Sequence, residues 1–273
     1  MPELPEVETV RCALAAAITK ATIKRVVLRR QDLRMPFPKN LAAMLSGQTI
    51  TAVERRAKYL LIQLSNKHTL IAHLGMTGRF SVIDKKPARF GAHDHVIWEL
   101  SDGRWVIYND ARRFGLMTLC TAAQLSKHPL LAALGPEPFD PAFNAAYLEN
   151  QLSRRSSSVK AAIMDQQVVV GVGNIYASEA LFLAGILPDL PAKKVAKQAK
   201  TLVKTIHRVL SGAIKSGGSS LRDFYHVSGE TGHFQHHFRV YDREGEPCFS
   251  CKNPIQSIRL SGRSSFFCAH CQS

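Results

Sequence analysis

Four cysteines near the end of the chain constrain its fold more than any other feature of the sequence. They form two Cys-x-x-Cys pairs separated by 16 residues, namely Cys248, Cys251, Cys268 and Cys271. Each pair can present two thiolates to one ion, and two such pairs complete a closed tetrahedral zinc site. A closed shell of four thiolates leaves no open coordination position. We therefore expect one structural zinc ion and look elsewhere for any chemistry.

The segment between the two cysteine pairs is suited to contact with phosphate, because it carries Arg259, Arg263, Ser264 and Ser265. A solvated hairpin tip would have similar residues, so the pattern alone leaves both interpretations open. The two remaining cysteines, Cys12 and Cys120, are expected to be small buried hydrophobic residues. Disulfides are not expected in a chain that the sequence places in the cytosol.

A strong positive charge suggests a polyanionic partner. The 273 residues include 36 Lys and Arg against 21 Asp and Glu, for a formal net charge of +15. The hydrophobic fraction of 45% supports a buried core and excludes a disordered basic tail. No apolar run approaches the ~20 residues of a membrane span, and the first residues do not resemble a secretory signal. We therefore expect a cytoplasmic protein with no membrane partner.

The first half of the chain is predicted to be one helix followed by antiparallel strands. A helix starting at Pro5 places Val7, Val10, Leu14, Ala17 and Ile18 along one stripe. Short runs rich in β-branched and aromatic residues then alternate with turn signals, which favours a sandwich. The predicted strands are 22–28, 49–53, 59–64, 69–74, 79–83, 95–100, 104–108 and 116–120.

The second half changes to a helical pattern. Prolines mark a linker at residues 126–140, and the predicted helices cover 141–152, 158–164, 174–184 and 191–215. A polar, glycine- and histidine-containing loop at residues 217–235 is long enough to suggest a functional lid.

Two glycines precede the predicted helix at residue 174. The segment from Gln167 to Tyr176 superficially resembles a dinucleotide fingerprint, but the third glycine and the βαβ unit are missing. What remains is a turn that exposes backbone amides at a helix N-terminus, where Asn174 can add a donor to an anion. A simple packing corner between two helices is the alternative.

The second residue is a candidate nucleophile. If Met1 is removed, Pro2 becomes a secondary amine whose pKa is roughly 7.7–8.0 for an α-amino group, so it is substantially unprotonated near neutral pH. Such an amine can attack an aldehyde-level carbon to form an iminium, with Glu3 as acid or base. Many ordinary proteins also begin with Met-Pro, so the dipeptide alone decides nothing.

Two glycine-bounded loops and one histidine motif are further candidates. Residues 109–115 place an aromatic ring beside two guanidinium groups, which can enter a base stack, although a tight turn with a core Phe114 is equally consistent. Residues 73–78 include Met76, which more often lies in a core. The motif at residues 93–95 has two histidines around an aspartate, and we favour phosphate contact or structural hydrogen bonding over a metal there.

Taken together, these segments resemble one family, formamidopyrimidine-DNA glycosylase, a bacterial base-excision repair enzyme. The resemblance extends nearly end to end, through residues 2–8, 56–61, 73–78, 109–115, 171–176 and 245–248 and the four cysteines. It implies an α+β multidomain fold with an N-terminal antiparallel β-sandwich and flanking helices. A helical helix-two-turn-helix domain and a C-terminal zinc β-hairpin follow. The implied divisions are 2–125 for the catalytic sandwich, 126–140 for the linker, 141–238 for the helical domain with a lesion-capping loop at 217–235, and 239–273 for the finger.

The resemblance also assigns roles to residues. It implies excision of 8-oxoguanine and formamidopyrimidines from duplex DNA, preferably opposite cytosine, and cleavage of the abasic site by β,δ-elimination through a Schiff base on Pro2. It makes Glu3 the acid for base departure, Lys58 a proton donor in the first elimination, and Arg263 the donor in the second. Met76, Arg112 and Phe114 are implied to fill the space left by the flipped base and to probe its orphaned partner, which in this family is cytosine. The implied contacts to the DNA backbone are His93, Arg155, Lys160 and Asn174. We expect a monomer that needs zinc but no nucleotide or redox cofactor.

Two departures from the family pattern affect this interpretation. Asp242 stands where the family more usually has glycine, which questions the local turn, although Asp tolerates the left-handed conformation better than most residues. The loop segment also contains four histidines, at 226, 233, 236 and 237, so its base contacts are not transferred.

Two other functions are considered. The endonuclease VIII-like branch acts on oxidised pyrimidines, but it typically has glycine in place of Leu4. A noncatalytic zinc-finger DNA-binding protein would have no use for Pro2, Glu3 or Lys58.

Overall fold

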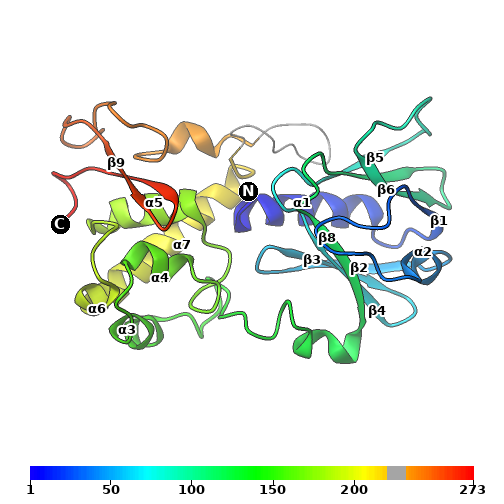
Figure 1. Ribbon diagram of the computed structural model, residues 1–273, viewed down its shortest axis with the longest axis horizontal. Coiled ribbons are helices and arrows are strands. Elements are labelled where there is room, and N and C mark those ends of the chain that lie inside the picture. Colours follow the sequence, from blue (N-terminus) through cyan, green and yellow to red (C-terminus); the bar gives the residue numbers. More distant parts are fainter. Residues whose placement is uncertain (220–231) are drawn as a thin grey trace. The chain divides into compact units, whose positions relative to one another are not determined.

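The computed structural model describes residues 1–219 and 232–273 (Figure 1). The chain divides into two compact units. Unit 1 contains Met1–Ala132 and Gly217–Gly232, and unit 2 contains Ala133–Ser216 and His233–Ser273. Most of the predicted lid, residues 220–231, lies outside the described residues.

Unit 1 opens with helix α1 (Leu4–Ile18), which begins with a capping box. The side chain of Glu3 accepts a hydrogen bond from the backbone of Glu6, and the Glu6 carboxylate accepts one from the backbone N–H of Glu3 at 2.9 Å. This reciprocal pair satisfies two N–H groups that a helix start leaves without partners. The predicted stripe is confirmed, because the helix buries Val7, Val10, Leu14 and Ile18.

The two cysteines of unit 1 differ in burial. Cys120 is buried at the end of strand β8 (Leu116–Thr121), as expected. The expectation for Cys12 is wrong, because its side chain is exposed and its Sγ lies 2.7 Å from a guanidinium nitrogen of Arg11. Position 12 falls outside the buried stripe of α1, so it meets solvent rather than the core.

Two antiparallel sheets of four strands form the body of unit 1 (Figure 1). The first has the order β1 (Ile23–Leu28), β6 (Asp94–Leu100), β7 (Trp105–Asn109) and β5 (Arg79–Ile83). The second has the order β2 (Ile50–Arg56), β3 (Tyr59–Leu64), β4 (His68–His73) and β8. Both sheets contribute to a single hydrophobic cluster with α1 and the short helix α2 (Leu41–Leu45). One shared core between two sheets confirms the predicted sandwich.

Unit 2 is helical before its final hairpin. Its elements are α3 (Ala145–Ser153), α4 (Val159–Met164), α5 (Asn174–Ala184), α6 (Ala192–Val195), α7 (Ala199–Lys215) and the 3₁₀ turns η2 (Ala196–Gln198) and η3 (Phe234–His237). The remaining 3₁₀ turn, η1 (Ala122–Lys127), belongs to unit 1. The predicted helix over 191–215 is interrupted by η2. The buried residues Ala192, Val195, Ala196 and Ala199 keep a helical spacing across the interruption, and no glycine or proline marks this break in the sequence.

The chain ends in a hairpin of β9 (Gln256–Leu260) and β10 (Arg263–Phe267). Its two-residue turn has positive φ at both Ser261 (48°) and Gly262 (78°), which matches the twist of the strands. The hairpin packs its buried Phe266 in a small cluster with Phe182 of α5. Within the described residues, no helix is long and apolar enough to cross a membrane.

Residue 242, where the family more usually has glycine, adopts a left-handed conformation. Asp242 has φ 59°, a value that glycine reaches at no steric cost and Asp tolerates better than most residues. The chain therefore keeps the turn without the glycine.

Candidate functional site

The N-terminus of α1 is buried although it begins the chain. Pro2 is buried, Glu3 is 3% exposed and Glu6 is 2% exposed, whereas Met1 is 53% exposed. Glu6 also accepts hydrogen bonds from the backbone N–H of Ser219 at 2.8 Å and from its hydroxyl at 3.0 Å. The helix start is therefore fixed on both sides, and the two candidate catalytic residues of the N-terminus have defined positions.

Lys58 lies in the tight turn between β2 and β3 and is 7% exposed. This turn is tied to α1 by Arg55, which donates to the Glu8 carboxylate at 2.8 Å and to the carbonyl of Ala57 at 2.9 Å. Ala57 takes positive φ, 54°, as the turn requires. The Glu8–Arg55 pair thus joins the helix that carries Pro2 and Glu3 to the turn that carries Lys58.

His73, at the end of β4, lies in the electrostatic field of Lys58. Burial and the positive charges of Lys58 and Arg34 lower the pKa of His73 from 6.5 to about 4. The ring is therefore neutral near pH 7, and its Nδ1 accepts a hydrogen bond from the backbone N–H of Gly75 at 3.0 Å. A neutral His73 thus shapes the start of the loop that carries Met76.

Met76, Arg112 and Phe114, which are predicted to fill the space left by a flipped base, lie on two loops that pack against each other. A Cβ at Gly75 would overlap the backbone of Phe114 and of its successor, so these loops approach as closely as glycine permits. Phe114 is 44% exposed, and the Arg112 guanidinium carbon lies 4.9 Å from the centre of its ring. The alternative of Phe114 as a core residue is excluded by this exposure. An exposed ring beside a guanidinium can enter a base stack.

His93 is exposed just before β6, and its carbonyl accepts the backbone N–H of Asp110 at 3.0 Å. His95 is buried, with its Nε2 at 2.9 Å from the carbonyl of Asp110. Asp94 contacts the amide of Asn109 at 2.7 Å. These contacts are structural hydrogen bonds, one of the two roles expected for the motif. Across the ranges 1–219 and 232–273 the cysteines are the one cluster with metal-ligand geometry.

Three candidate residues of unit 2 line one pocket of about 220 Å³, namely Lys160, Asn174 and Arg263. They come from α4, the start of α5 and the start of β10. Gly171 has φ 83°, and its N–H donates to the Gln166 side chain at 2.8 Å, which fixes the turn before α5. The pocket therefore combines two cations and a helix N-terminus, which suit an anion, with the carboxylate of Asp165, which is paired with Arg155.

Lys160 also holds the hairpin. It is 2% exposed, and its Nζ donates to the hydroxyl of Ser265 at 2.8 Å and to the carbonyl of Ser264 at 3.3 Å. The side-chain amide of Asn174 donates to the same Ser264 carbonyl at 3.0 Å. Arg155 instead pairs with Asp165 at 3.0 Å. The helices thus position the strand on which Arg263 lies.

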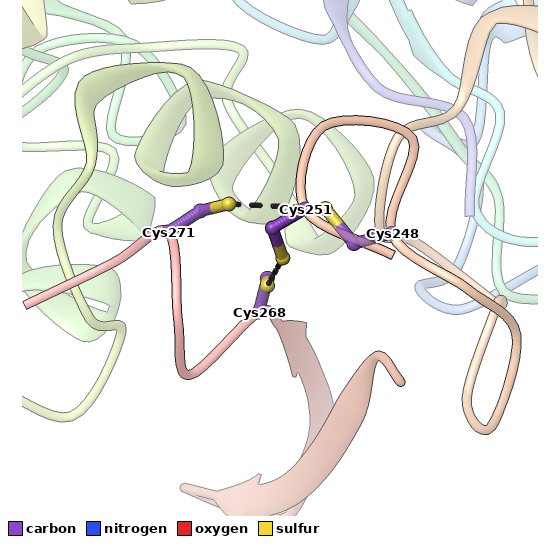
Figure 2. Close-up of side chains that lie close together, drawn as sticks. All are labelled: Cys248, Cys251, Cys268 and Cys271. Atoms are coloured by element: carbon purple, nitrogen blue, oxygen red, sulfur yellow. Dashed lines mark hydrogen bonds between the residues drawn. The ribbon is translucent and has the colours of Figure 1, made fainter. Parts of the chain in front are cut away.

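The four cysteine sulfurs converge at the base of the hairpin (Figure 2), where they all lie within 4.8 Å of one another. The sulfurs of Cys248 and Cys271 are 3.9 Å apart, and those of Cys251 and Cys268 are 3.4 Å apart. Four sulfurs ~2.3 Å from a central zinc would be ~3.8 Å apart in a tetrahedron. The residues therefore fit the expected closed thiolate site.

Sequence reasoning missed three buried polar residues that organise these sites. Asp110 is 0% exposed, Glu6 is 2% exposed, and Glu179 is 2% exposed with its carboxylate accepting backbone N–H groups of residues 239–241. Burial raises the pKa of Glu179. Only Glu6 had a signal in the sequence, as an acid in the first helical turn. Asp110 and Glu179 had none, because their hydrogen-bond partners come from distant loops.

Comparison with known proteins places the chain in a class, the DNA glycosylases. Three family profiles match the chain: "Formamidopyrimidine-DNA glycosylase N-terminal domain" over residues 1–117, "Formamidopyrimidine-DNA glycosylase H2TH domain" over 134–225, and "Zinc finger found in FPG and IleRS" over 245–273. A formamidopyrimidine-DNA glycosylase of Azorhizobium caulinodans is 48% identical, and the alignment covers 100% of each chain. The chain belongs to the formamidopyrimidine-DNA glycosylase family.

Solved structures agree with this assignment. Lactococcus lactis Fpg in complex with DNA containing an abasic site matches with a TM-score of 0.92 and 33% identity, over 99% of both chains. MutM in complex with DNA containing carbocyclic 8-oxo-G matches with a TM-score of 0.91 and 35% identity, over 100% of both. The chain is therefore a DNA glycosylase of base-excision repair directed at oxidised purines. Neither the oxidised-pyrimidine branch nor the noncatalytic DNA-binding protein is retained.

Proposed function

We propose that this chain excises 8-oxoguanine and formamidopyrimidines from duplex DNA, preferably opposite cytosine, and then cleaves the strand by β,δ-elimination. The observation that carries the proposal is the fixed N-terminus of unit 1. The capping box holds Glu3 at 3% exposure beside the buried Pro2, and the Glu8–Arg55 pair at 2.8 Å links that helix to the turn with Lys58. Nucleophile, acid and proton donor thus come from elements that are tied together.

Removal of Met1 converts the Pro2 nitrogen from an amide to a secondary amine. Its lone pair attacks C1′ of the damaged nucleoside, and the glycosidic electrons leave with the base, which takes up a proton. The nitrogen then releases its own proton, and the C1′–O4′ bond breaks as O4′ is protonated. Glu3 is the acid that assists both base departure and this opening of the sugar. The product is a cationic iminium between Pro2 and C1′. This cation acidifies the C2′ proton, whose loss expels the 3′ phosphate in the β step. Loss of a further proton expels the 5′ phosphate in the δ step, with Lys58 and Arg263 as the respective proton donors.

Base extrusion costs a few kcal/mol, which contacts in the vacated space must offset. Met76, Arg112 and Phe114 are the residues proposed to fill it. His93, Arg155, Lys160 and Asn174 are proposed to contact the DNA backbone. Because Lys160 already donates to the hairpin at 2.8 Å, its contribution to the backbone contact includes holding that strand.

One zinc ion is proposed to be held by Cys248, Cys251, Cys268 and Cys271. The sulfur positions support it, since they lie within 4.8 Å of one another. The ion would cross-link the base of the hairpin and take no part in the reaction. We further propose that the enzyme acts as a cytoplasmic monomer without nucleotide or redox cofactor.

The proposal is tested by the ends of the cleaved strand. A duplex with one 8-oxoguanine opposite cytosine should yield a one-nucleotide gap with phosphate on both sides. Glu3→Gln should lower base excision at least about a hundredfold, the scale of a general acid, yet still cleave a preformed abasic site, where no base has to depart. An intact strand after incubation with processed wild-type protein would refute the proposal.

A further inference from the structure

A buried carboxylate joins the two loops that carry the proposed space-filling residues. Asp110 is 0% exposed and follows strand β7. Its Oδ1 accepts the hydroxyl of Thr77 at 2.5 Å and the backbone N–H of Arg113 at 3.1 Å. Its Oδ2 accepts the backbone N–H of Gly115 at 2.8 Å. One side chain therefore holds both the loop with Met76 and the loop with Phe114.

Thr77 extends this connection to the backbone of Arg112. Its hydroxyl donates to Asp110 and accepts the backbone N–H of Arg112 at 3.0 Å. A hydroxyl can do both at once, because it has one donor and two lone pairs. Removal of this hydroxyl would leave the Asp110 oxygen with one donor fewer and the Arg112 N–H without this acceptor.

We infer that the Thr77–Asp110 pair is a positioning latch that sets Met76, Arg112 and Phe114 as one preformed unit for base extrusion. The inference rests on the proposed function. The latch touches neither substrate nor the reacting atoms. It fixes two loops before DNA binds, so that the conformational entropy of ordering them is not lost at the moment of extrusion.

Because the two loops approach closely, their relative position is sensitive to the loss of the Thr77–Asp110 hydrogen bond. A Cβ at Gly75 would meet the backbone of residues 114 and 115, and one at Gly115 would meet the hydroxyl of Tyr108 and the carboxylate of Asp110. The loops therefore have little freedom to slide while the hydrogen bonds are present. Without the Thr77 hydroxyl, the exposed ends of the loops are free to separate while the glycines remain in place.

The test compares a step that needs extrusion with one that does not. Thr77→Val keeps the side-chain shape and removes the hydroxyl. We expect cleavage of an 8-oxoguanine duplex under single-turnover conditions to fall about tenfold, the scale of one lost hydrogen bond to a charged group, with less than about twofold loss on a single-stranded abasic oligonucleotide. Discrimination against adenine opposite the lesion should weaken with it. Thr77→Ser restores the hydroxyl and should restore both properties.

Two controls make the outcome decisive. Thr121→Val removes a hydroxyl that contacts Gln124 at 2.9 Å at the end of β8, and it should change neither substrate. Asp110→Ala removes both carboxylate oxygens and should lower the same substrate ratio, and its combination with Thr77→Val should be less than additive, because each single variant already lacks the Thr77–Asp110 hydrogen bond. Equal losses on the two substrates, or an unchanged ratio in a folded Thr77→Val protein, would overturn the latch. Absence of abasic cleavage by the wild-type protein would instead overturn the proposed function.

Discussion

Among single residues, His73 makes a prediction about stability that does not depend on DNA. Its pKa is about 4 in the folded chain, because the ring is buried near the positive charges of Lys58 and Arg34, against 6.5 ordinarily. The unfolded chain therefore binds the proton first as pH falls through 6.5. The folded state loses stability progressively between pH 6.5 and pH 4, and the loss is complete below the folded pKa.

We expect His73→Asn to reduce this acid sensitivity. Asn can still accept the N–H of Gly75 but does not titrate. The fall in the free energy of unfolding between pH 7 and pH 5, measured with urea, should be smaller by about 2 kcal/mol in the variant than in the wild type. His68→Asn is a matched control, because His68 lies on the same strand and its ring Nδ1 lies 3.1 Å from the backbone carbonyl of Asn66. An identical pH dependence in wild type and His73→Asn would contradict the account.

The residues that could be predicted from the sequence are those with a local signal. The cysteine spacing located the metal-ligand cluster, and the unusual Asp242 pointed to a turn that does have φ 59°. Asp110 could not be predicted, because its carboxylate receives Thr77, which is 33 positions away in the chain. Cys12 was misjudged because residue type outweighed its place on the helix.

At the scale of elements, the order of the terminal hairpin depends on hydrogen bonds from the helices and on the cysteine site, beyond its own apolar packing. Its buried cluster is small and includes Phe182 of α5, while the ring centre of Tyr241 lies 5.1 Å from that of Phe266. Lys160 and Asn174 hold its second strand by three hydrogen bonds of 2.8 to 3.3 Å. A cross-link by zinc would therefore supply much of the order at its base.

Removal of zinc should disorder the hairpin and weaken DNA binding about tenfold or more, because Arg263 would lose its position at the pocket. Metal content is measured by mass spectrometry after chelation, and affinity by fluorescence anisotropy with a lesion duplex. Cys268→Ser should behave like the chelated protein. His270→Gln, an exposed substitution between two of the cysteines, should keep both metal and affinity. Unchanged affinity after verified loss of metal would refute the hairpin's role.

The elements themselves were largely predictable where periodicity was strong. The strands at residues 59–64 and 79–83 and the helix at 174–184 have the predicted bounds. The region 191–215 was predicted as one helix but has a 3₁₀ turn at 196–198. The buried residues 192, 195, 196 and 199 keep the spacing of one continuous helix across that break, and no glycine or proline marks it, so the sequence carries no local signal for it.

At the scale of the whole molecule, part of the net charge of +15 can be assigned to particular sites. Some of it lies at the pocket of unit 2, which Lys160 and Arg263 line, and some beside Phe114, where Arg112 lies. These positive charges suit a DNA backbone. The chemistry that distinguishes damaged DNA is assigned to an uncharged amine, and charge alone could not have revealed it.

The most direct test is covalent capture with borohydride on a duplex containing 8-oxoguanine opposite cytosine. Borohydride reduces an iminium to a stable amine, so processed protein that begins at Pro2 should yield one protein–DNA adduct, mapped by mass spectrometry to the N-terminal peptide. The same chain with an uncleaved extension before Pro2 has an amide nitrogen there and should yield none. An adduct on any other residue, or no adduct with processed protein that binds the duplex, would contradict the account.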